Sequence, residues 1–178
     1  MATLKIARVE VRCPGELVRH GVLAGVVAAI VLAAEEIVAT VLLGGTPGAP
    51  FRLIASTVFG PLALSPSYPL AVTVLVGAAI HLTLSVLFGV IFVFIVALFY
   101  QLSARAPLLL LYGVLYGLAL WELNVLTVLS LLFPGAVPRF SLANQIWNGV
   151  IAYAVFYGLV LGAYVVHARP GVVGDWTR

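Results

Sequence analysis

Six side chains that could exchange protons, bind a cation or form hydrogen bonds interrupt otherwise apolar stretches of this sequence: Glu35, Glu36, His81, Glu122, Asn124 and Asn148. Glutamate and histidine are the usual proton relays inside membranes, and together they can also bind a metal ion. Adjacent helical residues point about 100° apart, so Glu35 and Glu36 are expected to need separate partners.

These residues belong to a chain with the composition of an integral membrane protein. Of its 178 residues, 63% are hydrophobic and 8% are charged, whereas soluble domains contain about 25% charged residues. Cys13 is the single cysteine, which leaves no pair for a disulfide within the chain and no thiolate cluster for a metal. No basic run with interleaved aromatic residues occurs, so nucleic-acid binding is not expected.

Four segments are long and apolar enough to cross a bilayer, which takes about 20 residues. They run from about Leu17 to Leu43, Leu70 to Tyr100, Pro107 to Phe133 and Leu142 to His167. The breaks between them combine glycine or proline with polar residues, as turns do, and short turns join antiparallel neighbours. We predict an all-α fold in which residues 1–178 form a single transmembrane domain. It is an integral membrane four-helix up-down bundle with residues 1–15 as a cytoplasmic tail.

Two segments outside these spans allow more than one structure. The stretch "FRLIASTVFGPLALSP", residues 51–66, is apolar but too short to span. It predicts a short outer interfacial or re-entrant helix between helices 1 and 2, or else an irregular loop buried against the bundle. The tail "TLKIARVEVR" alternates apolar and polar residues, which suits either an extended edge or a disordered basic tail.

Small residues recur at four-residue spacing in every predicted span. The pairs are Gly21 and Gly25, Ser85 and Gly89, Gly113 and Gly117, and Gly158 and Gly162. Because this spacing lets helix backbones approach closely, each span is predicted to carry a packing stripe. The stretches "GVLAG" and "GVLYG" head the first and third spans, and a duplicated two-helix hairpin is one explanation.

The depth of the six polar side chains follows from counting residues from the middle of each span. All six fall within about 2 to 9 Å of the midplane, on the outer side, where they form a predicted polar layer that Trp121 can join. An ionised carboxylate at that depth costs about 2.5–3.5 kcal/mol, so these acids should face the bundle interior, keep a proton or pair with one another.

The predicted layer admits several functions. It can be a structural hydrogen-bond network, or a passage for a proton, a cation or a substrate. A metal site from a glutamate at 35 or 36 with His81 and Glu122 is a third reading, although the Glu-x-x-His pairs of di-iron bundles are absent. Haem ligation is disfavoured, because His20 and His167 lie in the opposite leaflet from His81. No nucleophile with a base, phosphate loop or cofactor fingerprint occurs, so enzyme activity is not expected and no cofactor is identified.

The segments "GAAIHLTLSVLFG", "YGLALWELN" and "YGLVLGA" resemble those of a group of small four-helix prokaryotic membrane proteins without an assigned function. The resemblance spans most of the chain and implies the four-helix architecture and a prokaryotic cytoplasmic (inner) membrane. The group is similar in size and build to accessory subunits of respiratory complexes such as haem–copper oxidases.

Basic residues predict the orientation. Seven lie before the first span, in the second loop or after the fourth span, and two lie on the opposite side: Lys5, Arg8, Arg12, Arg19, Arg105, Arg169 and Arg178 against Arg52 and Arg139. Since basic residues accumulate on the cytoplasmic side, both termini are expected there.

We therefore expect a non-catalytic accessory or scaffolding subunit of a larger membrane complex of respiratory type. Its expected partners are the lipid bilayer and other membrane subunits or further copies of the chain. Three features motivate this expectation: few polar groups, a second glutamate that needs a partner, and tails too short for a soluble domain. The alternative is a small oligomeric proton or cation conduit or transporter that uses Glu35, Glu36, His81 and Glu122.

Overall fold

The computed structural model describes residues 14–103, 105–124 and 146–168, and this part of the chain is helical apart from short turns, without a β-strand. In chain order its elements are α1 (Pro14–Leu42), α2 (Ala49–Phe59), the 3-10 turn η1 (Pro61–Leu64), α3 (Leu70–Ser103), α4 (Ala106–Trp121), the π-helical η3 (Ile146–Leu159) and α7 (Val160–His167). Four helical stretches are long and apolar enough to cross a membrane: Pro14–Leu42, Leu70–Phe99, Ala106–Asn124 and Val150–His167. The prediction of an all-α chain with four apolar helices is confirmed.

The helix ends differ from the predicted ones by a few residues. Helix α1 already includes Pro14, three residues before the predicted Leu17, and proline is tolerated in the first turn of a helix. Glu16 adds a negative charge at that end, which the helix dipole favours. Residues 1–13 of the predicted tail, 125–133 of the third span and 142–145 of the fourth lie outside the described residues.

Glycine brings α1 and α3 into backbone contact. A Cβ atom built on Gly21 would lie 2.5 Å from the Cα of Val90, and one on Gly25 would lie 2.6 Å from the carbonyl oxygen of Ser85. From the other side, a Cβ on Gly89 would lie 2.6 Å from the carbonyl oxygen of Gly21. The two predicted stripes therefore face each other, and the helices run antiparallel.

The second helix pair, α4 with η3 and α7, is built in the same way. Backbone atoms of Gly113 and Gly158 block a Cβ on either residue, and the backbone of Tyr153 blocks one on Gly117. A Cβ on Gly162 would lie 2.7 Å from the carbonyl oxygen of Leu109. All four predicted small-residue stripes are thus used, two in each pair.

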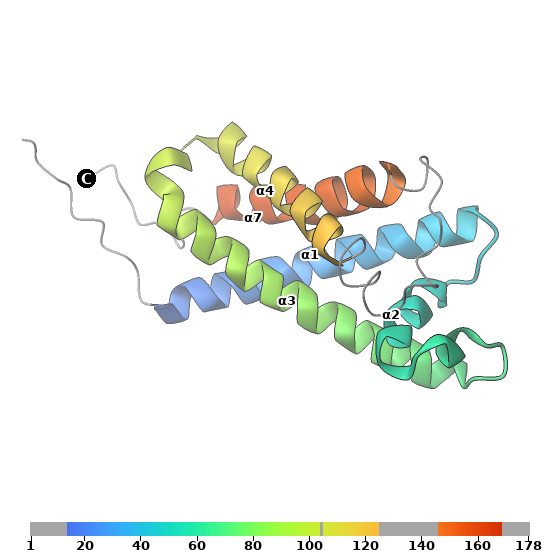
Figure 1. Ribbon diagram of the computed structural model, residues 1–178. Coiled ribbons are helices and arrows are strands. Elements are labelled where there is room, and N and C mark those ends of the chain that lie inside the picture. The colour runs from blue at the N-terminus through green and yellow to red at the C-terminus, as the bar shows by residue number, and fades with distance from the viewer. Residues whose placement is uncertain (1–13, 104, 125–145, 169–178) are drawn as a thin grey trace, which may run out of the picture.

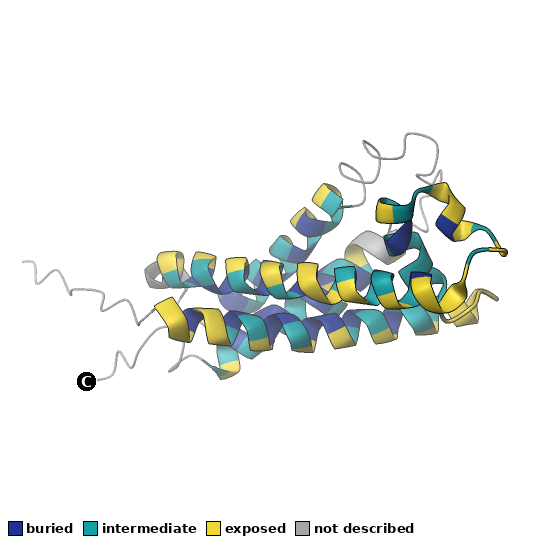
Figure 2. Ribbon diagram, turned by 90° about the horizontal axis from the view of Figure 1, so that it is seen from below, coloured by how far each residue is buried: buried dark blue, intermediate teal, exposed yellow. Residues whose placement is uncertain are grey.

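Tyrosine hydroxyl groups connect the two helix pairs. Tyr116 of α4 donates a hydrogen bond to the carbonyl oxygen of Phe88 at 2.9 Å, and Tyr157 of η3 donates one to that of Ser85 at 2.7 Å. The start of α1, the turn from α3 to α4 and the end of α7 lie at one end of the molecule, and α2 lies at the other (Figure 1). Buried residues line the surfaces between helices and exposed ones face outward (Figure 2), as a lipid-facing surface requires.

The apolar segment at 51–66 is helical, not the irregular loop that the sequence also allowed. Helix α2 packs on α3, where the backbone of Phe51 abuts Gly77. Arg52 closes the corner: its Nε and Nη2 donate to the carbonyl oxygen of Ala63 at 3.1 and 2.9 Å, and Nη2 donates to that of Ser65 at 2.6 Å. These bonds hold η1 against α2.

Candidate functional site

Glu35 is the best-anchored acid of the predicted layer. It lies in α1, is 8% exposed, and its Oε1 accepts a hydrogen bond of 2.8 Å from the indole Nε1 of Trp147 in η3. This bond links the first and fourth membrane helices. Its second oxygen, Oε2, is buried and accepts no hydrogen bond from the described chain.

Glu36 follows Glu35 on α1 and lies near Tyr153 of η3. Its Oε2 is also buried without a hydrogen bond from the described residues. Glu35 and Glu36 thus have different partners on the fourth helix, as their 100° separation on α1 requires.

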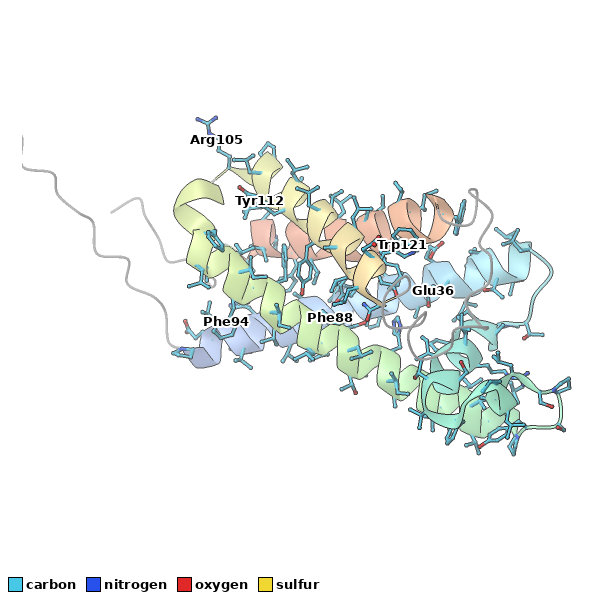
Figure 3. All side chains as sticks on the ribbon, in the orientation of Figure 1. Glu36, Phe88, Phe94, Arg105, Tyr112 and Trp121 are labelled. Carbon is cyan, nitrogen blue, oxygen red and sulfur yellow. The ribbon has the colours of Figure 1, made fainter. Side chains whose placement is uncertain are left out.

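Trp121, at the end of α4, supplies a hydrogen-bond donor to the same region. Its side chain is half-buried, and its Nε1 is buried without an acceptor among the described residues. Gly117, one turn earlier on the same face of α4, lies against the backbone of Tyr153. Figure 3 places Glu36 and Trp121 at the same position along the bundle.

His81 has a structural environment of its own, away from the glutamates. Its Nε2 lies 3.1 Å from the carbonyl oxygen of Ala29 in α1, and its ring meets that of Phe51 in α2 edge-on at 6.1 Å. Ala29 precedes Glu35 by six residues, or about 9 Å along the helix. His81 therefore joins α1, α2 and α3 at a point nearer the start of α1 than the two acids.

Two of the remaining predicted residues, Glu122 and Asn124, have described side chains. Glu122, the residue after the end of α4, is exposed, because it follows the inward-facing Trp121 by about 100°. The side chain of Asn124 donates to the carbonyl oxygen of Leu120, in its own helix, at 2.9 Å. The side chain of Asn148 lies outside the described part of the structure.

The positions of the acids and of His81 bear on the metal site considered from the sequence. Among the described residues, no group of three His, Cys, Asp or Glu side chains is close enough to hold a metal ion. All four acids and imidazoles proposed as ligands, Glu35, Glu36, His81 and Glu122, are described. They are therefore not gathered into the metal site considered from the sequence.

The structure adds tyrosines that sequence reasoning passed over. Tyr153 and Tyr157 lie in η3, and Tyr164 lies in α7. Near the opposite end from the acids, the hydroxyl group of Tyr164 lies 3.1 Å from Nδ1 of His20. The sequence analysis did not single out these tyrosines, since their contacts depend on how the helices pack.

Comparison with protein-family models, with curated proteins and with solved structures finds no match to this chain. The function must therefore be argued from the geometry of the site.

Proposed function

We propose that this chain is a small membrane transporter or conduit that moves protons or another small cation, with Glu35 and Glu36 as the groups that carry the charge. The observation that supports it is the pair of buried carboxyl groups, each with one oxygen that the described chain leaves without a hydrogen bond. Ionisable groups inside a membrane segment are functional-site candidates by default.

An energetic comparison argues against a purely structural role for the acids. An ionised acid deep in the membrane costs about 2.5–3.5 kcal/mol, and an interhelical hydrogen bond contributes about 0.6 kcal/mol on average. The described contacts of the two acids include one interhelical hydrogen bond, from Trp147 to Glu35. Hydrogen bonds from Tyr116 and Tyr157 also join the two helix pairs, so the bond to Glu35 is one of several connections between them.

The tyrosines supply polar groups between the acids and the end of the bundle where α1 starts and α7 ends. Going from the acids toward the end of the bundle where α7 ends, Tyr153 is followed by Tyr157 and then by Tyr164. The hydroxyl group of Tyr164 contacts the ring of His20. Hydroxyl groups can accept and donate protons in turn. These three tyrosines are therefore the proposed continuation of the proton path from the acids.

The proposed setting is the cytoplasmic membrane of a prokaryote, with both termini in the cytoplasm and the four spans as an up-down bundle. The excess of basic residues near the termini and the α3–α4 turn supports that orientation. Helix α2 and η1 would then lie at the outer interface, over the end of the bundle that holds the acids.

Flux measurements in vesicles test the proposal. Purified chain reconstituted into vesicles with a trapped pH-sensitive dye should dissipate an imposed pH difference faster than protein-free vesicles do. A parallel assay with a sodium- or potassium-sensitive dye identifies the cation. Vesicles that remain as tight as protein-free ones to all three ions would contradict the proposed function.

The accessory-subunit function remains a second proposal, and one observation favours it. Glu122 is exposed on a helix apolar enough to span the membrane, and a carboxylate facing lipid is unfavourable unless another group covers it. A subunit of a respiratory complex of the haem–copper oxidase type would provide that cover.

Native mass measurement after purification in mild detergent tests this second proposal. We expect stoichiometric foreign membrane subunits if the chain is an accessory protein. A monomer or a homo-oligomer alone, with no other polypeptide, would contradict it.

A further inference from the structure

Three buried polar atoms near the junction of α1, α4 and η3 have complementary hydrogen-bonding needs. Oε2 of Glu35 and Oε2 of Glu36 can accept hydrogen bonds, and Nε1 of Trp121 can donate one. None of the three has a hydrogen-bond partner among the described residues. Leaving such groups buried and unsatisfied costs about 1–3 kcal/mol each.

We propose that a single water molecule binds between these three atoms and that Glu35 and Glu36 share one proton through it. This inference rests on the proposed function and names the chemistry of the same site. The water oxygen accepts from Trp121 and from the protonated carboxyl group of Glu36, and the water donates to Oε2 of Glu35, which satisfies all three atoms at once. Buried waters typically make about three such bonds to otherwise unsatisfied groups.

The donor in this set argues for water rather than a bound metal cation. An indole N–H carries a positive hydrogen and cannot accept a hydrogen bond, so it repels a cation placed between the carboxyl groups. The same N–H stabilises the lone pair of a water oxygen. Tyr153, the other titratable side chain found to interact with Glu36, carries a hydroxyl group that can accompany the water.

Proton transfer between the acids is balanced in atoms and charge. The O–H bond of the protonated carboxyl at Glu36 breaks as its proton binds the water oxygen. An O–H bond of the water then breaks as that proton binds Oε2 of Glu35. The pair begins and ends with one proton and one negative charge, and the water is regenerated.

Infrared spectroscopy of the full chain in lipid tests the bridge. We expect a water O–H stretching band that shifts on transfer to heavy-oxygen water and is lost in Trp121→Phe, which keeps a ring but removes the N–H donor. The matched variant Trp147→Phe should retain the band, because Trp147 bonds the other oxygen of Glu35. The carbonyl stretch of the protonated carboxyl should shift in Trp121→Phe.

The outcomes separate this inference from the function beneath it. A wild-type spectrum without a water band sensitive to heavy oxygen overturns the bridge even if every variant fails to fold, and so does a band unchanged in Trp121→Phe. Cation flux without the band leaves the proposed function standing and removes the bridge. The band without flux leaves the bridge and removes the proposed function.

Discussion

Substituting alanine for Gly113 is expected to destabilise the protein by about 2 kcal/mol or more, because the new Cβ would overlap the backbone of Gly158. The blocking atoms are a carbonyl group and its neighbours, so rotation of a side chain cannot relieve the overlap and the two helices must separate. Titration of the detergent-solubilised protein with a denaturing detergent, followed by circular dichroism, measures the change.

Gly15 provides the matched control for that substitution. It is also a helical glycine, but a Cβ there would meet nothing within 4 Å. Gly15→Ala should therefore leave stability unchanged or raise it by up to about 1 kcal/mol, the helix propensity gained on replacing glycine with alanine. Equal unfolding curves for the wild type and Gly113→Ala would show that the α4–η3 contact does not hold the pair.

The second large effect is expected on cation flux. Glu36→Gln removes a charge-carrying group while keeping the shape of the side chain, and we expect flux to fall about 100-fold, within the range that a positioned acid or base contributes. Glu35→Gln should have a similar effect, although its amide oxygen can still accept from Trp147. The initial rate of dye response in reconstituted vesicles measures both.

Glu122→Gln is the control that tests whether the structure, rather than depth in the sequence, identifies the acids that carry the charge. Both Glu122 and Glu36 were candidates on spacing alone, but Glu122 is exposed and Glu36 has a buried oxygen. Flux should therefore persist in Glu122→Gln. Loss of flux in this variant with normal flux in Glu36→Gln would reverse the assignment of the site.

Hydropathy sufficed to predict the membrane helices, because a run of apolar residues is a local property. The small-residue stripes were also predicted, since four-residue spacing defines a helix face. Which stripe meets which was not predictable, because all four helices carry one. Gly21 and Gly25 meet Gly89, and Gly113 meets Gly158, and only the fold determines these pairs.

The candidate site was harder to predict than the fold. Depth counting brought out Glu35 and Glu36, but helix rotation about the axis decides which side chains meet, and depth carries no information on rotation. For this reason Glu122 turns outward and His81 bonds to Ala29. The bond between Trp147 and Glu35 depends on the contact of the first helix with the fourth, which no local pattern records.

The glycine contacts also restrict how this protein can change shape. Where backbones touch, one helix can slide along another only by a whole glycine interval of four residues, about 6 Å. Each helix pair, α1 with α3 and α4 with η3 and α7, should therefore move as a rigid unit. The two pairs are joined by the hydrogen bonds of Tyr116 and Tyr157 to carbonyl oxygens of α3 and by the side-chain contacts of α1 with the fourth helix. Rotation of one helix pair relative to the other would change the space around Glu35 and Glu36. Both acids lie on α1, and Glu35 bonds to η3 of the second pair.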